Sequence, residues 1–290
     1  MPGSRMTGRP VARRASFCEK AKKLRTGAAR RVTICALTSA LVLVGAARAE
    51  DDPDARFTPD MWRPDLLLSL SAGPALLPAG LDLDLPAPPG PLGTQGELDR
   101  LELIYAPLRD ERARHLIALE AEAGATELLW RYGLIPSKGE APALWSVLDA
   151  AASEVTWFVL REKRTHARAR PTQVRPGLGS VIPVPAHPSY PSGHAAQIIA
   201  LTEILGRVVP DCSPTYRRIA AGVAIRREIA GVHFPSDTLA GAQLADRVVD
   251  QLLRDGRVII PLGADTPLIR AHARTVGCAA SPPDGTGGAP

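Results

Sequence analysis

Apolar residues recur every three or four positions along most of the chain after residue 95, with charged residues between them. This spacing places the apolar side chains on one face of a helix, so each run predicts a helix that packs against a core. The runs cover residues 96–127, 141–162, 195–209, 215–225 and 237–253. Pro107 lies inside the first run and predicts two helices there, or one kinked helix.

No alternating strand pattern, internal repeat or glycine-rich nucleotide loop competes with these helices. None of the runs has the length of a membrane span, and charged residues such as Glu203 and Asp246 interrupt two of them. The pattern therefore predicts an all-α fold with one helical domain over residues 95–258, which is soluble once any N-terminal signal is removed.

The segments that flank this domain have a different composition. Residues 50–94 are rich in Leu and Pro, and the prolines exclude a long helix, so we expect an irregular strap laid over the core. Residues 259–290 form a C-terminal extension. Its last part, residues 276–290, is rich in Gly, Pro, Ser and Ala and predicts a disordered tail.

Charge is unevenly distributed along the chain, which has a formal net charge of +5. Residues 1–49 hold 11 Lys+Arg and one acid, whereas residues 50–290 hold 24 Lys+Arg and 29 acids. The first segment combines a basic start, an uncharged run over 32–47 and Ala47-Arg48-Ala49, which predicts a cleaved signal peptide; a retained anchor is the alternative. The remaining chain carries −5, which argues against nucleic-acid binding. We expect a periplasmic or secreted protein with no stable membrane insertion after cleavage.

Two cysteines, Cys212 and Cys278, remain after the predicted cleavage. A pair in an oxidising compartment can form a disulfide, which agrees with export. Two independent buried thiols are the alternative.

Candidate chemistry begins with positive charge near the end of the second helical run. Lys163 and Arg170 are seven residues apart, about two helical turns, and Pro171 ends the element. Four Lys or Arg lie between residues 163 and 170 with no acid among them, which is typical of an anion site, although a solvated surface has the same pattern. Arg227, far along the chain, can supply a third cation to the same anion.

Residues Ser192-Gly193-His194 lead directly into an apolar helix. Free N–H groups at a helix start favour an anion, and a glycine lets the backbone approach a ligand closely. The Ser192 hydroxyl adds a donor, and His194 is placed to protonate a departing oxygen. An ordinary capped helix start is the alternative.

His233 precedes the last helical run, and Asp237 follows four residues later. A carboxylate on one imidazole nitrogen fixes the tautomer and leaves the other nitrogen free to attack. A capping aspartate beside a core histidine is the alternative.

The chain carries three motifs in this order: Lys-x6-Arg-Pro, Pro-Ser-Gly-His and Arg-x5-His-x3-Asp. Together they resemble the three-part signature of the phosphatidic acid phosphatase type 2 superfamily, and the resemblance covers about residues 95–255. That superfamily groups soluble bacterial acid phosphatases, membrane lipid phosphatases and vanadium haloperoxidases. The residues around His194 and His233 look most like those of periplasmic class A acid phosphatases. Two departures are Arg226, where the third motif usually begins with Ser, and Ala195, where acid phosphatases often have Thr.

The resemblance implies a helical bundle of the acid phosphatase/vanadium haloperoxidase type and an exported acid phosphatase that hydrolyses small phosphate monoesters. His233 would form a phosphohistidine, Asp237 would orient it, and His194 would protonate the leaving group and then activate water. Phosphate would be bound by Lys163, Arg170, Ser192, Gly193 and Arg227. The resemblance implies no metal and no cofactor, and a protonated His194 beside a neutral His233 suggests an acidic-to-neutral optimum.

Three alternatives stay open: a lipid phosphate phosphatase at a membrane surface, a vanadium-dependent haloperoxidase with vanadate bound by the same residues, and an inactive phosphate-binding relative. The remaining histidines are expected to be structural or exposed, with His166 and His187 as candidates to line the pocket. The sequence leaves a homo-oligomer open.

Overall fold

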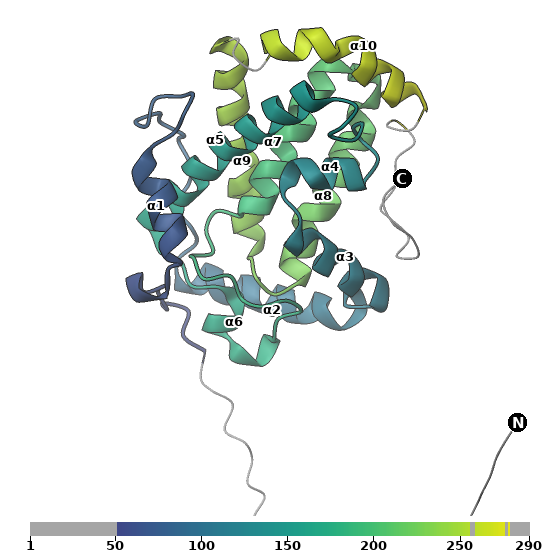
Figure 1. Cartoon of the computed structure of the whole chain (residues 1–290). Helices are drawn as coiled ribbons and strands as arrows, with labels where there is room; N and C mark the ends of the chain where they lie inside the picture. The colour runs from purple at the N-terminus through teal and green to yellow at the C-terminus, as the bar shows by residue number, and fades with distance from the viewer. Residues whose placement is uncertain (1–50, 256–258, 276–277, 279–290) are drawn as a thin grey trace, which may run out of the picture. The chain divides into compact units, whose positions relative to one another are not determined.

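The prediction of an all-α fold is confirmed by the computed structural model, which describes residues 51–255, 259–275 and 278 (Figure 1). The predicted signal peptide and nearly all of the predicted disordered tail lie outside these residues. Within them, ten α-helices and three short 3-10 helices form, and no strand does. The α-helices are α1 Pro64–Ala72, α2 Pro91–Leu108, α3 Glu111–Glu122, α4 Ala125–Arg131, α5 Pro142–His166, α6 Pro171–Val174, α7 Gly193–Val208, α8 Ser213–Ile229, α9 Pro235–Asp255 and α10 Ile259–Thr275.

Helix α7 lies in the middle of the bundle, with α5, α8 and α9 packed around it (Figure 1). Its residues are mostly apolar, and side chains on all sides of it, such as Ala195, Ile198, Leu201 and Ile204, are buried. A helix that is apolar all round is stable only when other helices surround it. The start of α7 is therefore fixed in the interior, where the second motif lies.

The predicted strap is more helical than expected. A nine-residue helix, α1, forms over Pro64–Ala72, and α2 begins at Pro91, inside the segment assigned to the strap. Both begin with proline, which is tolerated in the first turn because its missing N–H would have no partner there. Pro107 lies in the last turn of α2, so the prediction of two helices is correct; a third, α4, starts at Ala125.

A buried carboxylate of α5, Glu154, helps to attach the remaining irregular part of the strap. Glu154 accepts hydrogen bonds from three consecutive backbone amides, those of Ala75 (2.9 Å), Leu76 (3.1 Å) and Leu77 (2.6 Å). The prolines that exclude a long helix leave these amides without helical partners, and the glutamate supplies the partner instead.

The C-terminal extension contains a helix that the apolar pattern did not predict. Helix α10 packs against α5 and α7. Beyond it, Cys278 forms a disulfide with Cys212, at the end of the 3-10 helix Pro210–Cys212.

The prediction that none of the runs has the length of a membrane span is wrong for α5, which alone among the described helices is long and apolar enough to cross a membrane. Of its most apolar stretch, 56% is buried inside the protein. A core helix has the same properties, so this helix does not by itself indicate a membrane span.

Candidate active site

Lys163 and Arg170 meet at one site, but not by sharing a helix face. Helix α5 ends at His166, and Ala167 adopts the left-handed conformation (φ 46°). Arg170 lies beyond this turn, as the residue that precedes the first turn of α6. The helical-turn argument for Lys163 and Arg170 is therefore wrong, because the chain changes direction between them.

The loop before α7 brings the two cations together. Lys163 Nζ donates to the carbonyls of Pro188 (2.6 Å) and Ser189 (2.8 Å). Arg170 Nη2 donates to the Pro188 carbonyl (3.4 Å) and contacts His187 Nδ1 (3.1 Å). Both cations are almost fully buried, so backbone carbonyls and His187, rather than water, surround them.

The start of α7 has the geometry expected of an anion-binding helix terminus. Ser192 is the N-cap, and its Oγ accepts from the Ala195 amide (3.5 Å), which leaves its O–H free to donate. At Gly193, the nearest protein atom to an added Cβ would be a Val159 methyl at 3.5 Å, an ordinary contact. The protein alone does not require glycine here, whereas close approach of a ligand to the backbone would.

His233 and Asp237 form the predicted pair. His233 Nδ1 lies 3.2 Å from Asp237 Oδ2. The same carboxylate oxygen accepts from the Ser189 hydroxyl and from the Phe234 amide (2.9 Å). Since Oδ2 is an acceptor, Nδ1 carries the proton, and the Nε2 lone pair accepts a long hydrogen bond from Arg170 Nη1 (3.4 Å).

Arg168 is a site residue that the sequence reasoning missed. Its Nη1 donates to Asp237 Oδ1 (2.7 Å), and its Nη2 donates to Glu97 of α2 (2.8 Å). The guanidinium also lies over the Phe234 ring, 3.8 Å from the centroid. The signal was present in the basic run of residues 163–170, but only the two motif positions were selected from it.

Arg227 has nitrogen atoms left over for a ligand. Its Nη2 donates to Glu120 Oε2 (2.8 Å) and to the Ile117 carbonyl (3.1 Å). Its Nε and Nη1 are buried and have no hydrogen-bond partner among the described residues. Unpaired donors on a buried cation are costly, and an oxyanion would satisfy them.

The protein groups leave the site short of negative charge. Burial lowers the pKa of Lys163 well below its usual value, and neighbouring Arg170 adds to the effect. Burial lowers the pKa of Arg170 to about 9. Burial alone would raise the pKa of Asp237, but the Arg168 charge and the His233 hydrogen bond hold it below its usual range, so this carboxylate is ionised and already paired.

Both motif histidines are neutral in these surroundings. Burial lowers the pKa of His233 well below its usual value, and the charges of Arg170 and Lys163 lower it further, against the opposing effect of Asp237. Burial also lowers the pKa of His194 to about 3, with the Arg227 charge as the next cause. The expected protonated His194 therefore needs additional negative charge nearby.

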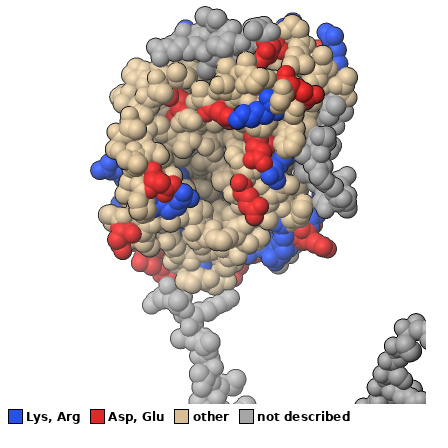
Figure 2. Space-filling model, viewed as in Figure 1, with Lys and Arg blue, Asp and Glu red and all other residues tan. Residues whose placement is uncertain are grey.

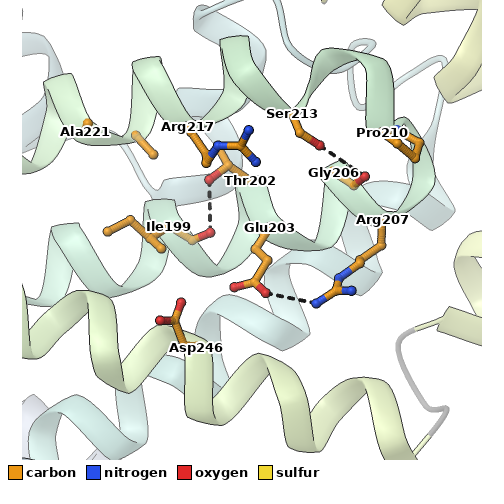
Figure 3. Close-up of a pocket in the computed structure, with 11 residues that line it drawn as sticks. Ile199, Thr202, Glu203, Gly206, Arg207, Pro210, Ser213, Arg217, Ala221 and Asp246 are labelled. Atoms are coloured by element: carbon orange, nitrogen blue, oxygen red, sulfur yellow. Dashed lines mark hydrogen bonds and ion pairs between the residues drawn. The ribbon is translucent and has the colours of Figure 1, made fainter.

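A cavity of about 720 Å³ lies between α7, α8 and α9, and no motif residue lines it (Figure 3). Glu203 lies on its floor, paired with Arg207 (3.4 Å), and Asp246 of α9 points toward Glu203. None of the predicted site residues lines it, so its size does not bear on the chemistry above.

Charged side chains on the face seen in Figure 2 form small mixed groups of Lys or Arg beside Asp or Glu, around a central hollow. This face has no continuous basic stripe of the kind that binds a nucleic-acid backbone.

Comparisons with known proteins found relatives, solved structures and a family model similar to this chain. Two curated proteins named decaprenylphosphoryl-5-phosphoribose phosphatase, from Mycobacterium tuberculosis strains CDC 1551 / Oshkosh and ATCC 25618 / H37Rv, are each 30% identical to this chain over 104 residues, which is 36% of the chain and 56% of each relative. The chain thus spans about half the length of the curated relatives that it matches.

Two solved structures are also similar. A bacterial vanadium-dependent iodoperoxidase has a TM-score of 0.53 at 16% identity, over 70% of this chain and 62% of that chain, which shows a shared fold. A transmembrane PAP2-type phosphatidylglycerolphosphate phosphatase from Bacillus subtilis has a TM-score of 0.37 at 16% identity, over 70% of this chain and 94% of that chain. The sequence model of the PAP2 superfamily matches residues 142–248, which carry all three motifs. This region of the chain is therefore similar to the PAP2 superfamily.

Proposed function

We propose that the chain is a metal-independent phosphatase that hydrolyses phosphate monoesters through a phosphohistidine. One observation carries this proposal: three buried cations, Lys163, Arg170 and Arg227, lie close to the motif histidines, His233 is paired with Asp237, and Arg227 has two unpaired donors. Such a set fits the equatorial oxygens of a transferring phosphoryl group, where negative charge is spread in the transition state.

In the first step, His233 Nε2 attacks phosphorus, the N–P bond forms and the ester P–O bond breaks. Asp237 stabilises the positive charge that the ring gains, and Arg168 keeps Asp237 ionised. The leaving oxygen takes a proton from His194. In the second step His194 removes a proton from water, which attacks phosphorus, and the N–P bond breaks to return His233 and release phosphate.

The substrate itself would set the protonation of His194. A unit charge about 4 Å away contributes about 4 kcal/mol at an effective dielectric constant of 20, which corresponds to roughly three pKa units. A phosphate dianion bound by Arg227 and its neighbours would therefore raise the pKa of His194 from about 3 toward neutrality. This supports an acidic-to-neutral optimum for the complex.

Lys163, Arg170 and Arg227 supply, in this proposal, the positive charge that a metal ion supplies in other phosphatases. The described residues hold no group of three or more His, Cys, Asp or Glu placed to bind a metal. Vanadate would fit the same cations and His233, which keeps a haloperoxidase as a further outcome of the test below.

A lipid-linked phosphate ester is the second candidate substrate. The curated relatives are named for a phosphoribose with a decaprenylphosphoryl group. In this chain the exposed apolar side chains Leu67 and Leu68 belong to α1, and the residue before α1, Arg63, donates from its amide to Ala186 of the loop that holds Lys163 and Arg170 (3.0 Å). An apolar surface thus begins next to the site.

We further propose that the protein is exported. The disulfide between Cys212 and Cys278 is typical of a periplasmic or secreted protein, in agreement with the predicted signal peptide. Among partners, we propose a small phosphomonoester and no nucleic acid.

The test uses the purified chain and p-nitrophenyl phosphate with excess chelator. We expect hydrolysis that resists the chelator and is blocked by vanadate. Quenching in alkaline detergent should trap a phosphorylated protein, because the N–P bond of a phosphohistidine is labile in acid and stable in alkali. His233→Ala should abolish both signals, while His115→Gln, at an exposed histidine, keeps them. Bromide or iodide oxidation with vanadate and peroxide, without hydrolysis, would show a haloperoxidase instead. A preference for a polyprenyl-linked phosphate over the small ester would select the second candidate.

A further inference from the structure

Glu120 of α3 is a buried carboxylate that lies outside all three motifs and outside the matched residues 142–248. It is fully buried, yet it has partners on every side. Its Oε2 accepts from Arg227 Nη2 (2.8 Å), and its Oε1 accepts from Arg226 Nε (2.7 Å) and from the Tyr132 hydroxyl. A buried carboxylate with this many donors is held in one orientation.

The two arginines reach the same carboxylate from neighbouring positions on α8. Arg226 stands where the family usually has Ser, and it uses its Nη2 to donate to the Tyr132 hydroxyl as well (2.9 Å). Tyr132 and Arg226 therefore brace the side of Glu120 that faces away from Arg227. The unusual Arg226 has a structural reason: it pairs with Glu120, and the carboxylate separates two guanidinium groups that would otherwise repel each other.

Glu120 also contacts the second reacting group. Its backbone hydrogen-bonds to the His194 ring, and the Arg227 charge is close enough to His194 to lower the pKa of that histidine. The end of α3 thus touches both the cation that binds the phosphoryl oxygens and the group that protonates the leaving oxygen.

We propose that Glu120 is a positioning residue: its carboxylate, braced by Arg226 and Tyr132, fixes the guanidinium of Arg227 so that the unpaired Nε and Nη1 face the transferring phosphoryl group. This inference rests on the proposed phosphatase function. Without the carboxylate, Arg227 would lose the partner that fixes one end of its guanidinium and would be repelled by Arg226. Loss of the carboxylate makes the site more positive, and this added charge would offset the weaker contact of Arg227 when a ground-state dianion binds. It would not restore the alignment of Arg227 that the transition state requires.

The test is Glu120→Gln, which keeps the shape of the side chain and removes its charge. We expect kcat to fall about 10- to 100-fold with KM changed less than about threefold, because an interaction specific to the transition state is lost. Binding measured by calorimetry should show the same split: the Kd of orthovanadate, which can adopt the geometry of the transition state, rises with the loss in kcat, while the Kd of orthophosphate changes less than about threefold.

Glu122→Gln is the matched control, since Glu122 is exposed on the same helix, and it should leave all four quantities unchanged. Tyr132→Phe removes one hydrogen bond to Glu120. It should lower kcat and raise the Kd of vanadate about threefold, with KM and the Kd of phosphate unchanged, and it keeps the inference testable if Glu120→Gln does not fold. Equal losses for vanadate and phosphate, or wild-type values in both variants, would overturn the role of Glu120.

The calorimetric binding measurements distinguish a failure of this inference from a failure of the proposed function. If Glu120→Gln weakens the binding of vanadate but not of phosphate, and the wild-type chain does not hydrolyse esters, the function is wrong and the positioning role stands. If the wild-type chain hydrolyses esters and Glu120→Gln does so equally well, the positioning role is wrong and the function stands.

Discussion

At the scale of single residues, the nucleophile depends on a chain of ion pairs that begins outside the motifs. Arg168 donates hydrogen bonds to Glu97 and to Asp237, and Asp237 in turn accepts from His233. Each link is buried or nearly so, and in such a setting the loss of one partner leaves a charge without compensation.

Arg168→Gln should therefore lower kcat by about 10- to 100-fold, as the loss of an outer partner of a catalytic group commonly does. The Arg168 charge lowers the pKa of Asp237, so its removal raises that pKa. Protonated Asp237 cannot accept from His233 Nδ1, and the acidic limb of the kcat profile should shift to higher pH. Arg164→Gln, at an exposed arginine of the same segment, is the control. A pH profile that falls without shifting would contradict this link.

The protonation of His194 gives a second prediction. At about pH 5.5 the histidine is neutral in the free protein, because its pKa is about 3. Sulfate remains a dianion at this pH, and its binding should raise the pKa of His194 and draw about half to one proton from the buffer. Calorimetry in buffers of different ionisation enthalpy measures this uptake, and it should vanish in His194→Gln. Equal uptake by the two proteins would refute the assignment.

At the scale of elements, the site depends on how closely α9 approaches the start of α7. A Cβ on Gly241 of α9 would lie 2.6 Å from the Ser192 carbonyl oxygen, which is too close for any arrangement without movement. The Ser192 amide in turn donates to the Asp237 carbonyl (2.9 Å), so the second and third motifs are joined through their backbones.

Gly241→Ala should thus displace the start of α7 and impair catalysis more than folding. We expect kcat/KM to fall about tenfold or more, with an overpacking cost of about 1–3 kcal/mol in the free energy of unfolding. Gly96→Ala, in an exposed position of α2 with open space around it, should be neutral or slightly stabilising. Wild-type kinetics in Gly241→Ala would show that the approach of α9 is not critical.

The helices themselves were largely predictable, and their irregular connections were not. Apolar periodicity gave α5, α7, α8 and α9, because each buries a broad apolar face. It missed α10 and the early start of α2. It also placed Arg170 on a continued helix, because no local pattern announces the left-handed Ala167. Turns of this kind depend on tertiary contacts such as those of the loop before α7.

At the scale of the whole molecule, the site combines side chains from α3, α5, α7, α8 and α9 with carbonyls from the loop before α7. The three motifs identified the proposed reacting groups, because a lysine, arginines, histidines and an aspartate at these spacings and in this order are seldom found together for another reason. Glu120 and Ser189 could not be chosen from the sequence, and Arg168 could not be told apart from Arg164 within the basic run. The role of each comes from packing across more than 40 residues of chain.

The disulfide acts at the same scale. Cys212 and Cys278 are 66 residues apart, and the chain-entropy model assigns about 4 kcal/mol to a loop of this length. The double variant Cys212→Ser/Cys278→Ser should lower Tm by roughly 8–16 °C, since 1 kcal/mol corresponds to about 2–4 °C in a chain of this size. Its activity at 25 °C should stay the same, because neither cysteine is among the site residues. A reductant should lower the Tm of the wild type and leave the double variant unchanged; equal Tm values would contradict the bridge.

The three buried cations make the stability and the activity of the protein depend on the anions in its medium. A bound anion that pairs with Lys163, Arg170 and Arg227 stabilises the folded chain, by about 2.7 kcal/mol at a hundredfold excess over its Kd. Phosphate is such an anion, and in the proposed reaction it is also the product that competes with substrate. A phosphate-rich medium should therefore stabilise the folded enzyme and inhibit it. In a phosphate-poor medium the enzyme should reach its full rate but should unfold more readily.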